Sequence, residues 1–299
     1  MDLFNTGVRP LIDDWLIEES KKTRDYGDFW SASSAGYCMR KNIFERLNLP
    51  HIETDGDARK QRVFTAGKMF HEWIQGITKK AGISVAQEVE LQDEDLMIRG
   101  HFDDLILIEE PLPDMPYSDD GKGKGGKYDP NMPEQHLILY DYKTVNSRAF
   151  MWAKKNGNAM SHFHRMQLGT YMYMLRKKEK LEWEESTAYA DTVEHEWKTI
   201  VTKDVAEARI LKLEKDTLMM MEQQLLWSPE LEKDVVSYWK TLNGYWKSQQ
   251  IPNCTCADFE GGFMAKPQYN PFFYNGEPCS VEYFAKFKEL SNEWKERTK

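Results

Sequence analysis

The sequence predicts an α/β protein in which a mixed β-sheet is flanked by helices. Residues 136–145 read H-L-I-L-Y-D-Y-K-T-V, an apolar run that is typical of a buried strand. Two further strand patterns precede it, over residues 83–91 and 96–109. Long amphipathic patterns that predict helices lie on either side of these strands, over residues 59–80 and 160–178.

The remainder of the chain is expected to continue this alternation. We expect strands over 185–192 and 196–202, and helices over 203–227 and 229–249. We predict a single unit over residues 1–299, with an N-terminal helical segment (1–80), a core (81–202) and a C-terminal helical, cysteine-bearing segment (203–299). Residues 111–135 are rich in Gly, Lys and Pro, which predicts an exposed insertion loop.

The composition is that of an ordinary soluble globular protein. Hydrophobic residues make up 40% of the 299 positions and charged residues 30%. The sequence has no apolar run of membrane-spanning length, and residues 1–19 lack the features of a signal peptide. We therefore expect a cytoplasmic protein without a membrane partner.

The net charge of -9 conceals a strongly basic stretch. Residues 142–180 contain nine Lys or Arg and a single acid, Glu179, a local charge of +8. Such a stretch is compatible with a polyanionic substrate, although basic runs are most often solvated helix faces.

Asp141 and Lys143 are two charged residues near the end of the predicted central strand. Side chains alternate in a strand, so these two share one face. Burying charges is costly unless they are paired or bind a metal, which leaves two interpretations, a functional site or a structural ion pair.

The preceding strand pattern supplies a second acidic pair, Asp103 and Asp104. These two residues face opposite sides, so only one of them can share a site with Asp141. Gly100 leaves room for a close approach of backbone or substrate. Two carboxylates, a lysine and a histidine form an oxygen-rich site with one nitrogen ligand, a donor set that suits Mg²⁺ or Mn²⁺.

The sequence contains four cysteines, which are Cys38, Cys254, Cys256 and Cys279. Disulfides are disfavoured in a reducing cytosol, whereas four thiolates complete a tetrahedral zinc site or ligate an iron-sulfur cluster. The alternative is that they are small buried apolar residues.

The order of these motifs resembles the RecB-like branch of the PD-(D/E)XK nuclease superfamily. The matching residues are the helical His71 in G-K-M-F-H, Gly100 and Asp103 in G-x-x-D, Asp141 and Lys143 in D-x-K, and Gln167 and Tyr171 in Q-x-x-x-Y. Cys38, in S-x-x-x-x-C-x-R, and the three later cysteines are similar to the iron-sulfur members of that branch, which include CRISPR-associated adaptation nucleases. The resemblance covers roughly residues 31–280.

The resemblance implies a restriction-endonuclease-like fold and assigns a role to each matching residue. It implies that His71, Asp103, Asp141 and the main-chain carbonyl of Tyr142 bind Mg²⁺ or Mn²⁺. It further implies that Lys143 orients the attacking water, and that Gln167 and Tyr171 position the scissile strand. Glu88 is a further candidate ligand, and His101 is interpreted as a bystander. The alternatives are that His71 is a hydrogen-bonded core histidine and that Tyr171 only packs. Arg40, Lys41, Arg148 and Arg165 are candidates for phosphate contact.

The function implied is a metal-dependent deoxyribonuclease, an exonuclease acting on single-stranded or frayed DNA ends. The alternative is a DNA-end-binding subunit of a recombination, repair or adaptation complex with weak nuclease activity. The resemblance also implies a [4Fe-4S] cluster, with structural Zn²⁺ as the alternative. Here the spacing departs from the family pattern, because Cys254 and Cys256 form C-x-C and 22 residues separate them from Cys279.

Overall fold

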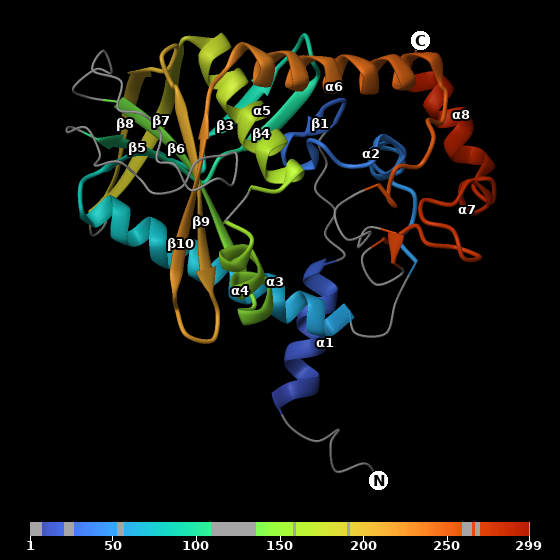
Figure 1. The fold of residues 1–299 in the computed structure, drawn as a ribbon, viewed down its shortest axis with the longest axis horizontal. Coiled ribbons are helices and arrows are strands. Elements are labelled where there is room, and N and C mark those ends of the chain that lie inside the picture. Colours follow the sequence, from blue (N-terminus) through green and yellow to red (C-terminus); the bar gives the residue numbers. More distant parts are fainter. Residues whose placement is uncertain are drawn as a thin grey trace. The chain divides into compact units, whose positions relative to one another are not determined.

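The computed structural model forms two compact units (Figure 1). The first, which we call the cysteine unit, contains Met1–Trp30, Gly36–Phe70 and Trp239–Lys299; the second, the sheet unit, contains Ser31–Ala35 and His71–Tyr238. The structure describes residues 8–20, 27–52, 57–108, 136–157, 160–189, 192–258, 265–266 and 270–298. The predicted insertion at 111–135 lies outside the described residues.

A five-stranded sheet forms the centre of the sheet unit. Its order is β10 (Met220–Leu226), β9 (Glu207–Glu214), β6 (His136–Val145), β5 (Asp104–Ile108) and β2 (Ser84–Gln87). The middle strand β6 pairs parallel to β9 and antiparallel to β5, so the sheet is mixed, as predicted. Leu139 and Ile138 on β6 are fully buried, which places the apolar half of this strand in the core.

Two smaller sheets complete the strands. The first has the order β1 (Trp30–Ser31), β4 (Ile98–His101) and β3 (Glu90–Asp93), and a hairpin joins β7 (Lys180–Tyr189) to β8 (Thr192–Val201). Each of the two strands predicted over 83–91 and 96–109 is therefore broken into two. The first break contains Glu88, whose φ is 50°, and the second contains Asp103. Neither residue belongs to a strand, so neither is constrained by the hydrogen bonds of a sheet.

Helices cover the sheet unit. Helix α4 (Ser147–Lys155) packs on β9, and α5 (His162–Lys178) packs on β6 and β9. The side chain of Ser161 caps the start of α5 by accepting a hydrogen bond from the His164 amide. Gly169 permits close packing of α5, because a Cβ there would lie 2.8 Å from Leu231 Cδ1 of α6 (Pro229–Ser248).

The prediction of a helix over residues 203–227 is wrong, because this stretch forms β9 and β10. It contains no Pro or Gly and many helix-favouring residues in an amphipathic pattern, which predicts a helix. In the structure Arg209 and Glu207 are buried and paired with each other, and Arg209 Nη1 also lies 3.0 Å from Oε2 of the partly buried Glu222. Pairing of β9 with β6 and β10 overrides the local helix propensity.

The cysteine unit is built from both ends of the chain. It contains α1 (Val8–Ser20), α2 (Met39–Arg46), α7 (Val281–Phe284) and α8 (Lys288–Arg297), and the boundary between the units falls within α3 (Asp57–Lys80) and α6. The guanidinium of Arg46 lies 4.2 Å from the Trp30 ring centre and 4.3 Å from that of Trp246, so cation-π contacts help to hold its two chain ends together. Within the described part of the chain, we find no helix with the length and apolar character needed to cross a bilayer.

Candidate metal centre and cysteine site

Asp141 lies at the centre of a polar cluster on the buried strand β6. Its side chain is only 5% exposed, and its Oδ1 accepts hydrogen bonds from Lys143 Nζ at 2.8 Å and from Gln167 Nε2 at 3.0 Å. Its other oxygen, Oδ2, is buried and has no hydrogen-bond partner among the described residues. A buried carboxylate oxygen without a partner is costly, and a bound cation would satisfy it.

Asp103 approaches the same cluster from the break between β4 and β5. Its Oδ2 accepts the Tyr142 amide at 2.7 Å and lies 3.5 Å from Nδ1 of His71 on α3. Ligand atoms of His71, Glu88 and Asp103 all lie within 4.8 Å of one another. The candidate ligand Glu88 is therefore brought beside His71 and Asp103.

Gln75 is a supporting residue that the sequence analysis missed. Its Nε2 donates to Glu88 Oε1 at 2.9 Å and to the Asp103 carbonyl at 2.8 Å. Gln75 follows His71 by four residues on α3, so both lie on one helix face. That i, i+4 spacing was the signal that could have identified it.

The charges in this cluster perturb one another's ionisation. Burial raises the pKa of Asp103 to about 8, with a further contribution from the Asp141 charge, although Lys143 opposes it. Burial and the Lys143 charge lower the pKa of His71, which favours the neutral imidazole that a metal requires. A divalent cation would displace the Asp103 proton and offset the charge of both carboxylates.

These residues fit Mg²⁺ or Mn²⁺. Two carboxylates and one imidazole, those of Glu88, Asp103 and His71, converge within 4.8 Å. Asp141 is not part of that group, but its buried Oδ2 has no partner among the described residues. Tyr142 contributes its backbone amide to Asp103. The metal-binding role of the Tyr142 carbonyl stays a prediction.

Asp104 belongs to a different environment, as strand alternation predicts. This carboxylate is fully buried and satisfied by four donors, so it stabilises the fold and has no remaining capacity for a ligand. The donors are Thr78 Oγ1 and Ser84 Oγ at 2.6 Å, Tyr142 Oη at 2.9 Å and Gln87 Nε2 at 3.2 Å.

Tyr171 is buried beside Gly100, where its side chain is 4% exposed. A Cβ on Gly100 would lie 2.9 Å from Tyr171 Oη and 2.8 Å from Ala32 Cβ. The space left by Gly100 is therefore filled by protein. The role of Tyr171 in positioning a substrate stays a prediction, and its observed role is packing.

His164 lies on the same face of α5 as Gln167 and Tyr171, which follow it at i+3 and i+7. Its Nδ1 is buried without a partner among the described residues. Burial, followed by the Lys143 charge, lowers the pKa of His164 to about 4. This histidine is therefore neutral at physiological pH. The sequence motifs assign no role to this histidine.

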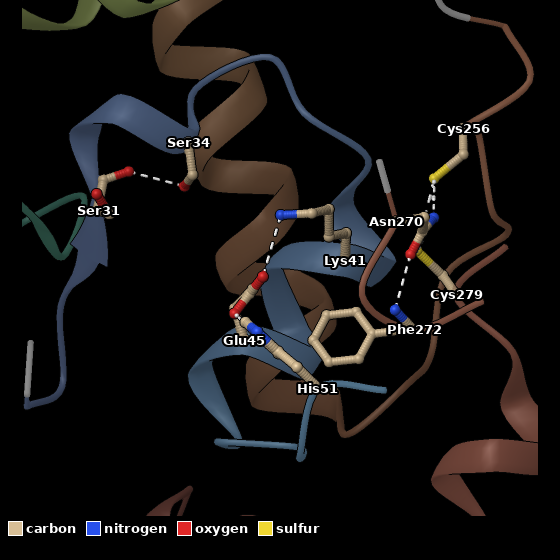
Figure 2. Close-up of polar contacts among 9 residues, drawn as sticks. All are labelled: Ser31, Ser34, Lys41, Glu45, His51, Cys256, Asn270, Phe272 and Cys279. Carbon is tan, nitrogen blue, oxygen red and sulfur yellow. Dashed lines mark hydrogen bonds and ion pairs between the residues drawn. The ribbon is translucent and has the colours of Figure 1, made fainter. Parts of the chain in front are cut away.

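The four candidate phosphate contacts have different surroundings. In the cysteine unit, Arg40 Nε donates to the Pro252 carbonyl at 2.7 Å, and Lys41 Nζ bonds Glu45 at 3.1 Å (Figure 2). In the sheet unit, Arg165 lies 3.9 Å from Asp234, and Arg148 is exposed. Arg40 therefore holds the C-terminal segment, and Arg148 is the most accessible of the four.

The four cysteines meet within the cysteine unit, and their sulfur atoms all lie within 4.8 Å of one another. Cys38 Sγ lies 3.9 Å from Cys254 Sγ, and Cys256 Sγ lies 3.5 Å from Cys279 Sγ. Three of the four are fully buried, and Cys254 is partly exposed. The neighbouring thiols lower the pKa of Cys38 and raise that of Cys279, so the cysteines do not ionise independently.

Asn270 supports two of these cysteines. Figure 2 shows its side chain directed at Cys256 and Cys279, and its Nδ2 lies 3.4 Å and 3.3 Å from their sulfurs. Its Oδ1 accepts the Phe272 amide at 3.0 Å, which fixes the orientation of the side chain. A side chain that donates to the ligand sulfurs and holds them in place is a common feature of metal-thiolate sites. The cysteines can therefore bind a metal ion or a cluster.

Comparisons with known proteins add little. No protein-family model matches the chain, and no curated protein matches it significantly. Among solved structures, the chain is similar to one titled "Crystal structure of SSO0001", at 12% sequence identity and a TM-score of 0.41. The match covers 81% of this chain and 88% of that one. A similarity this low assigns neither a family nor a function.

Proposed function

We propose that the protein is a metal-dependent nuclease that hydrolyses phosphodiester bonds, acting as a DNA exonuclease on single-stranded or frayed ends. The observation that carries the proposal is the unpartnered, buried Oδ2 of Asp141 beside the Lys143 ammonium, with His71, Glu88 and Asp103 gathered in the same unit. The choice of DNA, and of end-directed cleavage, rests on the resemblance to RecB-like nucleases.

Each residue of the centre has a task in this proposal. His71, Asp103, Asp141 and the Tyr142 carbonyl would hold the ion, with Glu88 as a further ligand. A bound Mg²⁺ or Mn²⁺ supplies a water of lowered pKa and stabilises charge on the phosphate oxygens. Lys143 offsets phosphate charge and orients the attacking water, while Gln167 holds the Asp141 carboxylate in a fixed orientation.

The decisive experiment measures cleavage of end-labelled DNA strands with Mg²⁺ or Mn²⁺. We expect the wild type to cleave, and Asp141→Ala and Lys143→Ala to lose activity by about a hundredfold or more. Asp95→Ala is a suitable control, because Asp95 is an exposed acid of the same unit. No cleavage by the wild type, or undiminished cleavage by both site variants, would contradict the proposal. RNA and duplex substrates tested in parallel define the preference.

A second candidate is a DNA-end-processing subunit of a recombination, repair or adaptation complex. It is favoured by exposed apolar side chains within the cysteine unit, since large apolar patches mark interaction surfaces. Leu11 and Trp15 on α1 and Phe64 and Met69 on α3 are all more than half exposed. Weak cleavage by the isolated protein that rises at least tenfold with a helicase or integrase partner would support this role.

The cysteine site is proposed to be a structural metal centre. The resemblance implies a [4Fe-4S] cluster, whereas the observed sulfur spacing favours the alternative, a single Zn²⁺. In a four-iron cluster each thiolate binds a different iron, so the sulfurs must lie farther apart than around one ion. Iron and sulfide analysis of anaerobically purified protein decides between them: four irons with sulfide indicate the cluster, and one zinc indicates the ion.

A further inference from the structure

Helix α4 begins directly after the strand that carries Asp141 and Lys143. The side chain of Asn146 caps it by accepting the Ala149 amide at 2.9 Å. Ser147 Oγ bonds Glu214 at 2.6 Å, and the Lys215 amide donates to the Val145 carbonyl at 3.0 Å. These contacts fix the start of α4 to the ends of β6 and β9, so the helix is held firmly where the strand that carries Asp141 and Lys143 ends.

The two faces of α4 differ sharply. Phe150 and Ala153 are buried against the sheet unit. On the outer face, Arg148, Trp152 and Lys155 follow each other at i, i+4 and i+7, which places them on one stripe. Trp152 is 53% exposed, which is unusual because tryptophan side chains are mostly buried on average.

The charged side chains of α4 itself are all basic. The helix sequence S-R-A-F-M-W-A-K-K contains no acid. Arg148, Lys154 and Lys155 are exposed, and none of them forms an ion pair with another residue that the structure describes. A solvated helix face explains the cations but leaves Trp152 without an explanation.

We propose that the outer face of α4 is a platform for single-stranded nucleic acid, with one base stacked on Trp152 and adjacent phosphates bound by Arg148 and Lys155. This inference rests on the proposed nuclease function, in which the platform would guide the nucleic-acid strand toward the candidate metal centre. An indole ring stacks on any base, and cations flanking it match the charge of the backbone on both sides of that base. Duplex DNA offers its phosphates but keeps its bases stacked inside.

The test measures binding of a fluorescently labelled oligo(dT) by anisotropy, with Ca²⁺ replacing Mg²⁺ so that binding is separated from cleavage. We expect Trp152→Ala to weaken binding about tenfold, and Trp152→Phe to restore most of it, because base stacking needs an aromatic ring. Arg148→Ala and Lys155→Ala should each lower the salt dependence of binding by about one phosphate contact. Trp197→Ala is the matched control, since Trp197 is 72% exposed on β8.

A strand with an abasic site at each position in turn supplies a second measurement. When the abasic site falls at the nucleotide that stacks on Trp152, the wild type should bind the strand more weakly. The Trp152→Ala variant should bind that strand and the intact strand equally well. Unchanged oligo(dT) binding by Trp152→Ala, an equal loss in Trp197→Ala, or stronger binding of duplex than of oligo(dT) would each overturn the platform. If the wild type binds oligo(dT) through Trp152 but cleaves no DNA, the nuclease proposal is contradicted and the platform proposal stands.

Discussion

Gln167 and Asp141 join helix α5 to strand β6 through a hydrogen bond of 3.0 Å from the amide Nε2 to the carboxylate Oδ1. The same oxygen receives the Lys143 ammonium at 2.8 Å. Two donors on one oxygen leave the other oxygen, Oδ2, unoccupied by any hydrogen-bond donor that the structure describes. The pair therefore fixes which side of the Asp141 carboxylate is open to a ligand.

Replacing Gln167 should impair cleavage without unfolding the protein. Gln167→Ala removes the hydrogen bond that orients the Asp141 carboxylate, and misplacement of a catalytic group lowers the rate, so cleavage should slow roughly tenfold to a hundredfold. Initial rates on single-stranded DNA check this, with thermal melting as the measure of folding. Gln167→Glu should be at least as damaging, because it places a second carboxylate against Asp141. Activity equal to the wild type in both variants would show that Gln167 does not orient Asp141.

Replacing Lys143 should separate metal binding from catalysis. Lys143→Met keeps the length of the side chain and removes its charge, so cleavage should fall about a hundredfold. Binding of Mn²⁺ should be retained, because the ammonium repels a cation and supplies no ligand. Calorimetric titration with Mn²⁺ and cleavage assays on the same sample provide the two readouts. Loss of Mn²⁺ binding together with activity would show instead that Lys143 holds the ligands in place.

The raised pKa of Asp103 predicts a pH-dependent stability of the metal-free protein. In the folded protein the Asp103 carboxyl keeps its proton up to about pH 8, whereas the usual pKa of an Asp carboxyl in an unfolded chain is 3.8. Between pH 3.8 and about pH 8 the folded state holds the Asp103 proton and the unfolded state does not, so the free energy of unfolding falls as the pH rises through this range. Asp103→Asn should therefore increase the melting temperature in EDTA, by more at pH 8 than at pH 5.

Metal binding should reverse this trend in the wild type. The ion displaces the Asp103 proton, so Mn²⁺ should raise the melting temperature more at pH 8 than at pH 6. Melting curves of wild type and Asp103→Asn, with EDTA or Mn²⁺, give all the comparisons. A difference in melting temperature that does not vary with pH would show that Asp103 does not titrate in this range.

Gly100→Ala should destabilise the fold. The new Cβ would lie 2.8 Å from Ala32 Cβ and 2.9 Å from Tyr171 Oη, and overpacking of this kind costs about 1–3 kcal/mol in the free energy of unfolding. Gly76→Ala, within helix α3, is the control, because no atom lies within 4 Å of its added Cβ. That variant should be neutral or up to about 1 kcal/mol more stable. Urea denaturation measures both, and equal stability of the two variants would contradict the packing described.

Asn270→Ala should weaken metal retention at the cysteine site. Loss of the two contacts to Cys256 and Cys279 should reduce metal affinity about 10–100-fold, the range typical when a residue that supports metal ligands is removed. Metal release to a chelator, followed spectroscopically, checks this for either zinc or a cluster. Asn253→Ala is the control, because Asn253 is exposed in the same segment as Cys254. Equal release rates in the two variants would remove the role assigned to Asn270.

The sequence by itself determined the elements whose local pattern agrees with the fold. The apolar run of β6 and the amphipathic faces of α3, α5 and the N-terminal part of α6 were predicted close to their observed bounds, because periodicity reports directly which side chains are buried. The spacing of Asp141 and Lys143 likewise required them to share a face, and they form an ion pair.

Only the tertiary structure decided the elements and contacts that depend on distant partners. Residues 207–226 became strands because β6 and β10 supply hydrogen bonds, and Arg209 finds buried acids that no local pattern reveals. The breaks in the strands bring Glu88 and Asp103 to His71, and Gln75, from a distant helix, donates hydrogen bonds to both of them. The meeting of four cysteines spread over more than two hundred residues is also a property of the fold, because chain spacing alone does not set distances between segments so far apart.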